Sequence, residues 1–165
     1  MSQSESKENT AVAAATPPGE LPRDLVNFLT GGQCCIVATL DDAGAPATTL
    51  MTWVVARDPV TLTMAFDQRS RALRNLRKRP LVAIEVLGDG LCYGLRGHAE
   101  VEKETMDAAP FPSALVAVRI EECRDHGAPG VRFFGPRYEF EAGKEHRGEV
   151  EKAVFAELRG TPPPV

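Results

Sequence analysis

The sequence has no apolar run that approaches the roughly 18 to 20 residues needed to cross a bilayer. The Ala-rich stretch at residues 11–15 has neither the long apolar core nor the basic start of a secretion signal. These two absences predict a cytoplasmic protein without a membrane partner.

Cysteine and histidine are also scarce, with four and three residues respectively. The cysteines have no CxxC spacing and no histidine at a metal-ligand spacing, so we expect no metal site but buried, reduced thiols. The histidines have no partner pattern, and we expect all three at the surface. These residues are Cys34, Cys35, Cys92 and Cys123, and His98, His126 and His146.

No Ser/His/Asp triad or carboxylate pair can be argued from spacing, so no catalytic residue is assigned. The net charge of −4 argues against general nucleic-acid binding, which requires a broad basic face. The length of 165 residues, with 43% hydrophobic and 25% charged residues, fits one globular domain. We place that domain at residues 21–160, after a disordered tail at 1–20 and before a proline-rich tail at 161–165.

Alternation of apolar residues with period two predicts a mainly β fold. Few helices and short turns favour a six-stranded antiparallel β-barrel of Greek-key type with peripheral helices. In the fifth strand, Cys92, Arg96, His98 and Glu100 are expected on the solvent face. The expected strands are 34–40, 47–56, 60–66, 81–87, 91–102 and 114–124, and the expected helices are 22–29, 71–79, a short one within 104–113, and 144–158.

One segment of the chain stays without an assigned role. The aromatic residues between 131 and 141 must pack on other parts of the protein, either as a lid over a pocket or as a cover for a barrel edge.

Positive charge is concentrated in one stretch, where five arginines and one lysine fall between Arg69 and Arg79. Ser70 is a good N-cap for a helix that starts at Arg71 and ends before Pro80. A helix start presents unpaired N–H groups and partial positive charge, so with Arg69 and Arg71 beside it the place suits a phosphate. The alternative is a solvated basic helix face, which is what charge runs usually form.

Three pieces of sequence resemble the FMN-binding split-barrel superfamily, which holds the pyridoxamine 5′-phosphate oxidase-like proteins and their deazaflavin-using relatives. The pieces are Gly44-Ala-Pro46 before a strand carrying Trp53, then Ser70-Arg71 opening Arg74-Asn-Leu-Arg77 with Pro80 beyond, and Leu95-Arg-Gly-His-Ala-Glu100. The resemblance covers about residues 25–124, and the Ser-Arg helix start is its most specific part.

The resemblance implies a split barrel and a homodimer with FMN across the subunit interface. The phosphate would be held by Ser70 and Arg71, with Arg69 and Arg74 near. The isoalloxazine ring would lie along the second strand. The strand residues implied in the ring site are Thr49, Leu50, Met51 and Thr52, whereas Trp53 is expected to be a core or dimer-interface residue.

Two departures from the family pattern weaken the expected phosphate grip. Ala72 stands where many relatives carry lysine, and Thr49 stands where the oxidase has a phosphate-binding arginine. Each lost charge-assisted contact is worth roughly 1.5 to 3 kcal/mol, which Arg69 or Arg74 can partly replace. The C-terminal Arg/His signature of true pyridoxamine phosphate oxidases is also missing, so vitamin B6 synthesis is not expected.

The leading hypothesis is a flavin-dependent oxidoreductase that moves a hydride between FMN and a small substrate. A second is a reductase that uses the deazaflavin cofactor instead. A third is a protein that holds flavin, haem or another tetrapyrrole without turnover, and a dimer that has lost its ligand is the last alternative.

Overall fold

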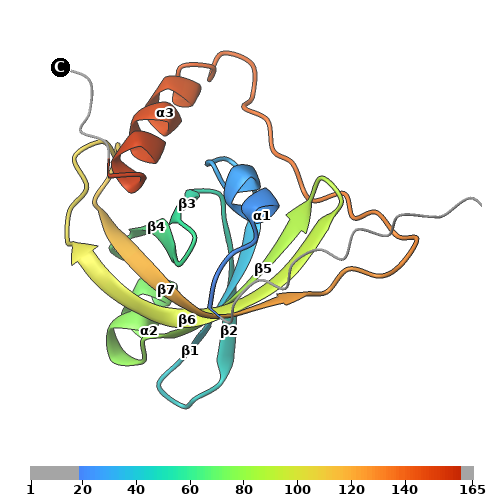
Figure 1. The fold of residues 1–165 in the computed structure, drawn as a ribbon. Coiled ribbons are helices and arrows are strands. Elements are labelled where there is room, and N and C mark those ends of the chain that lie inside the picture. The colour runs from blue at the N-terminus through green and yellow to red at the C-terminus, as the bar shows by residue number, and fades with distance from the viewer. Residues whose placement is uncertain (1–18, 161–165) are drawn as a thin grey trace, which may run out of the picture.

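The computed structural model describes residues 19–160, and the seven strands found there form one antiparallel sheet in the order β2-β1-β5-β6-β7-β4-β3. The long strands β6 and β7 sweep across the molecule and the sheet curls around a central core (Figure 1). The mainly β antiparallel fold is confirmed. Its strands are β1 (Cys35–Leu40), β2 (Pro46–Met51), β3 (Val54–Asp58), β4 (Thr61–Asp67), β5 (Leu81–Gly88), β6 (Leu91–Lys103) and β7 (Ser113–Asp125).

The prediction of six strands was wrong, because the strand expected at 47–56 is two strands. β2 pairs with β1 at one edge of the sheet, and β3 pairs with β4 at the other. The chain changes edges at Thr52 and Trp53, whose carbonyl oxygens accept from the amides of Gly32 and Ala65, both at 3.1 Å. Period-two alternation continues through this junction, so the sequence pattern does not reveal it.

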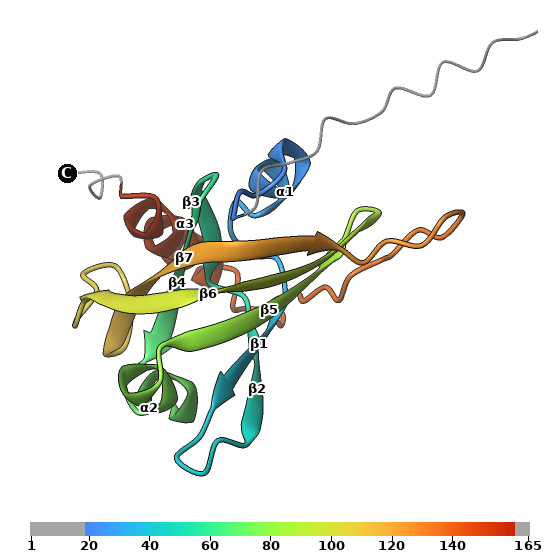
Figure 2. The same ribbon diagram turned by 60° about the horizontal axis from the view of Figure 1, so that its bottom comes forward.

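Three helices in the described residues flank the sheet: α1 (Arg23–Phe28), α2 (Arg71–Lys78) and α3 (Arg147–Leu158). α2 is the predicted basic helix, and it lies where β4 ends and β5 begins (Figure 2). Its apolar side enters the main core through Ala72, Leu73 and Leu76. α3 starts three residues later than predicted, after a set of turns.

A second, smaller core lies on the opposite face of β3, β4 and β7 from the main core. Val154 and Leu158 of α3 are fully buried there against Val55, Ala65 and Leu115. These three strands are therefore covered on both faces, and α3 completes the fold at this edge.

The short helix expected within 104–113 is not formed, and this prediction was wrong. Backbone amides of Asp107 and Ala108 instead donate to the Glu157 carboxylate, at 3.0 and 2.7 Å. Pro110 and Pro112 lack the N–H groups that a helix would use. A side chain from α3 therefore satisfies the amides that a helix would have satisfied internally.

All four cysteines are free; Cys34, Cys35 and Cys92 are buried, and Cys123 is half-buried. Cys92 corrects the prediction of a solvent position, because its thiol packs 3.6 Å from a Glu85 carboxylate oxygen. Burial, with the neighbouring Cys34, raises the pKa of Cys35 to about 12, so this thiol stays protonated at neutral pH.

The three histidines are exposed, as predicted. No helix within residues 19–160 combines the length and the apolar content required to cross a bilayer. Except for Gly19 and Glu20, the two predicted tails lie outside the described residues.

Candidate functional site

The start of α2 is built by a local capping interaction. The Ser70 hydroxyl accepts from the amide of Leu73 at 3.2 Å, and the Ser70 carbonyl accepts from Arg74 at 3.3 Å. No hydrogen bond joins the amides of Arg71 and Ala72 to any residue in 19–160. The predicted N-cap is therefore confirmed, and two first-turn amides remain able to donate.

Three guanidinium groups lie around this helix start. Arg69 donates to the Asp67 carboxylate at 3.1 Å, and this hydrogen bond holds the pKa of Asp67 below its ordinary value. Arg71 lies 3.7 Å from Asp41 in the β1–β2 turn, and its side chain is 59% exposed. Arg74 is exposed and forms no ion pair with a described residue. Arg71 and Arg74 are therefore only loosely engaged by protein groups, which suits reversible anion binding, whereas Arg69 is paired.

The second half of the basic stretch has firmer protein partners. Arg77 pairs with Glu104 at 2.5 Å, and Lys78 pairs with Asp42 at 2.7 Å. The hydrogen bond from Lys78 lowers the pKa of the Asp42 carboxyl. The positive charge left for a ligand is thus at the N-terminal half of α2.

The strand implied in the ring site is β2, an edge of the sheet. Leu50 lies opposite Ile36 of β1 and is 59% exposed, whereas Met51 is buried. Thr49 and Thr52 are half-buried. Since β2 has a sheet neighbour on one side only, main-chain groups on its other side are available to a flat heterocycle.

Met51 and Thr52 also line a cavity of about 440 Å³. Its other walls come from the end of β4, from the loop before β7 and from the C-terminal segment. Asp67, the partner of Arg69, lines it as well, but Thr49, Leu50, Ser70, Arg71 and Arg74 do not. The remaining lining residues are Trp53, Ala65, Phe111, Tyr138, Glu139, Phe140, Arg147 and Glu151.

The sequence did not indicate Glu151, the residue that hydrogen-bonds two other lining residues of this cavity. Glu151 of α3 accepts from the indole N–H of Trp53 at 2.9 Å and from the hydroxyl of Tyr138 at 2.7 Å. It lies in the helix predicted at 144–158, but no local pattern shows that its partners are 98 and 13 residues away in the chain. Trp53 stacks on Phe111 with ring centres 5.5 Å apart, and its half-buried position fits the expected structural role.

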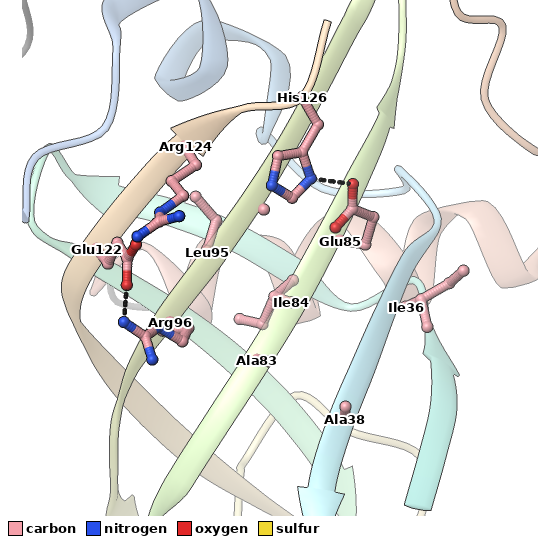
Figure 3. Close-up of a pocket in the computed structure, with 11 residues that line it drawn as sticks. Ile36, Ala38, Ala83, Ile84, Glu85, Leu95, Arg96, Glu122, Arg124 and His126 are labelled. Carbon is pink, nitrogen blue, oxygen red and sulfur yellow. Dashed lines mark hydrogen bonds and ion pairs between the residues drawn. The ribbon is translucent and has the colours of Figure 1, made fainter. Parts of the chain in front are cut away.

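A second hollow, of about 440 Å³, lies on the outer face of β1, β5, β6 and β7 (Figure 3). The Arg96–Glu122 ion pair and a hydrogen bond between His126 and Glu85 span it. A Cβ on Gly94 would clash with the His126 ring, so glycine there allows the imidazole to lie across β6.

Apolar side chains continue from this hollow across the same face. An adjoining hollow is lined by Leu40, Pro46 and Leu81, and Ile36, Leu50 and Leu81 are 42, 59 and 52% exposed. We call this area, from Ile36 to Leu81 with the charged residues of β6 and β7 at its border, the outer face. An exposed apolar centre with a polar border is typical of an interaction surface.

The family model described as pyridoxamine 5′-phosphate oxidase matches residues 21–136. The chain belongs to this family. None of the curated proteins matches the sequence. The matched range contains the seven strands, α1 and α2, whereas residues 137–160, which include α3, lie beyond it.

Solved structures of low sequence identity share the split-barrel fold. A candidate pyridoxamine 5′-phosphate oxidase of Lactobacillus delbrueckii superposes with a TM-score of 0.57 at 23% identity, covering 66% of this chain and 96% of that one. HupZ of Group A Streptococcus gives 0.57 at 16% identity, with coverages of 72 and 99%. An F420 reductase gives 0.52 at 19% identity, with coverages of 63 and 98%.

The comparisons agree with the resemblance in fold and family. The structure also shows where the two departures from the family pattern, Ala72 and Thr49, lie. Ala72 is buried in the main core, and Thr49 lies half-buried in β2. The cations nearest the helix start are therefore Arg69, Arg71 and Arg74.

Proposed function

We propose that this protein binds FMN as a homodimer and transfers a hydride between the flavin and a small organic substrate. The observation that supports this most strongly is the capped start of α2, where Arg69, Arg71 and Arg74 accompany two amides able to donate. Family membership supplies the second argument.

The residues present fit a flavin nucleotide. Guanidinium groups and helix amides are the donors that a phosphate requires. The edge strand β2 offers main-chain donors and acceptors to the polar edge of the ring, and Thr49 and Thr52 offer hydroxyl groups. When bound, the flavin would supply the hydride chemistry.

The chain's own residues would bind and orient that group. Arg71 and Arg69 would neutralise the phosphate, and their partners Asp41 and Asp67 hold the two guanidinium groups beside the helix start. The buried Met51 gives the end of β2 an apolar side, which excludes water from a ring packed there.

The proposed dimer uses the outer face. Its exposed apolar residues lie on β1, β2 and β5, and Leu50 belongs both to this face and to the proposed ring site. A second copy packed on the outer face would therefore close the flavin site from outside. A cytoplasmic location, in keeping with four free cysteines, is part of the same proposal.

The test is an absorption spectrum of the purified protein followed by titration with FMN. We expect a flavin spectrum, or saturable quenching of FMN fluorescence with a rise in melting temperature. If neither quenching nor a melting shift occurs, the proposal fails. Steady consumption of reduced nicotinamide by the flavin-loaded protein supports an enzyme, and its absence with a range of electron donors supports a storage protein instead.

The same titration with the deazaflavin cofactor and with haem tests the two alternative ligands of the proposed flavin site. Tighter binding of the deazaflavin cofactor than of FMN would make the protein a deazaflavin-dependent reductase, the activity named for one structural neighbour. Tighter binding of haem, with a Soret band in the isolated protein, would replace the flavin proposal altogether.

A further inference from the structure

The cavity beside Met51 and Thr52 has walls of aromatic rings. Trp53 and Phe111 are stacked with 17° between their planes, and Tyr138 meets Phe140 edge to face with ring centres 5.9 Å apart. Such walls favour a flat ligand that stacks on or inserts between π faces. Its volume of about 440 Å³ is within the range of sites for small molecules.

The cavity depends on long-range contacts that Glu151 makes. Its two carboxylate oxygens accept from Trp53 of the β2–β3 junction and from Tyr138 of the C-terminal segment. Burial and the hydrogen bond to Glu151 raise the pKa of the Tyr138 hydroxyl well above its ordinary value, so it remains a donor. Glu151 is therefore a positioning residue for two of the cavity walls.

The charge of the lining is unbalanced. Asp67, Glu139 and Glu151 contribute three carboxylates, whereas Arg147 is the single cation among the lining residues. Because Arg69, which lies outside the lining, pairs with Asp67, the lining keeps an excess of one negative charge. The Arg147 guanidinium lies over the Phe140 ring, 5.9 Å from its centre, at the outer limit of a cation–π contact. The lining favours a positively charged aromatic ligand and disfavours a carboxylate or phosphate.

We propose that this cavity is the substrate site and that it binds planar aromatic cations of the N-alkylpyridinium type. The proposal rests on the proposed function, because Met51 and Thr52 belong both to the ring strand and to the cavity wall. A ligand held here lies beside the end of that strand, with Tyr138 and Phe140 of the C-terminal segment among the lining residues.

The chain carries its own reporter for the test. Trp53 is the only tryptophan, so intrinsic indole fluorescence reports on the cavity wall with or without flavin. We would titrate the protein, both free of FMN and loaded with FMN, with 1-methylnicotinamide, a cationic probe. Neutral nicotinamide and anionic nicotinate are the controls.

We expect saturable quenching by the cation and binding about tenfold weaker for nicotinate, a ratio in the range of one unfavourable charge contact near a protein surface. Phe140→Leu should weaken cation binding by about tenfold. Glu151→Gln should weaken it similarly and also shift the Trp53 emission, whereas Glu149→Gln, an exposed carboxylate on the same helix, should change neither.

Three results would overturn the proposal: no quenching by the cation, equal binding of cation and nicotinate, or unchanged binding in Phe140→Leu. Competition between FMN and the cation for the same site would make the cavity the flavin's own ring slot. That outcome rejects a separate substrate site but leaves the proposed flavin function intact. If Glu151→Gln does not fold, Phe140→Leu and the ligand series still decide the question.

Discussion

At the scale of single residues, two buried polar side chains fix α2 to the sheet. Asn75 is 4% exposed, and its amide donates to the Thr39 hydroxyl at 3.0 Å. Thr39 lies on β1 opposite Ala47 of β2. The phosphate end of the proposed site is thereby held in a fixed position relative to the strand implied in the ring site.

Asn75→Ala removes this donor and leaves the Thr39 hydroxyl buried. We expect a loss of about 1 to 3 kcal/mol in the free energy of unfolding, because the buried Thr39 hydroxyl loses the hydrogen bond from Asn75 and keeps only the longer one to the Ala47 carbonyl, at 3.5 Å. Urea denaturation followed by circular dichroism measures it. Arg74→Ala, one residue away and exposed, is the control and should change stability by less than about 0.5 kcal/mol; an equal loss in both variants would contradict the explanation.

At the scale of elements, α3 is held to the 104–112 loop by one carboxylate. Burial alone would raise the pKa of Glu157, but hydrogen bonds from Lys103, Ala108 and Asp107 outweigh it and lower the pKa below the ordinary 4.5. A carboxyl with a lowered pKa in the folded state contributes stability above its unfolded pKa. That contribution is lost as the pH falls through the lower, folded pKa.

Glu157→Gln should therefore be less stable than the wild-type protein at pH 7 by about 1 to 3 kcal/mol, the cost typical of a lost charge-assisted hydrogen bond. The difference should shrink as the pH falls below 4.5. Melting temperatures of both proteins between pH 3 and 7 test this. A stability difference that stays constant across that range would show that Glu157 does not act through its charge.

Elements defined by local chemistry were predictable from the sequence. Ser70 before an apolar-basic run predicts the start of α2, and Gly88-Asp-Gly90 predicts the β5–β6 turn that the structure contains. The break at Thr52 was not predictable, because it depends on which edge strand each half joins. The loop at 104–113 was mistaken for a helix because its amides are satisfied by Glu157, more than forty residues later.

In the candidate site, too, one part could be predicted from local sequence and another part could not. Its phosphate end comes from consecutive residues of one helix start, which sequence spacing can show. The cavity wall combines Trp53 with Tyr138 and Glu151, and only the folded chain brings these together. Side chains that act on distant partners carry no periodic signal.

At the scale of the whole molecule, the outer face is the surface that the proposed dimer requires. Leu81→Glu places a charge in its apolar centre, and we expect a shift from dimer to monomer in sedimentation velocity. Phe134→Glu is the matched control, because Phe134 is 79% exposed and lines neither hollow of the outer face. Dissociation by the control, or a Leu81→Glu protein that remains dimeric, would contradict the assignment of the interface.

The central claim is that the start of α2 binds the phosphate of FMN. A comparison of FMN with riboflavin tests this claim most directly, because riboflavin lacks only the phosphate. We predict that the wild-type protein binds FMN at least about tenfold more tightly than riboflavin, the ratio expected for one charge-assisted contact. Arg71→Ala should abolish most of this preference, while Arg79→Ala, at the other end of α2, should retain it. Equal affinity of the wild-type protein for the two flavins would contradict the account.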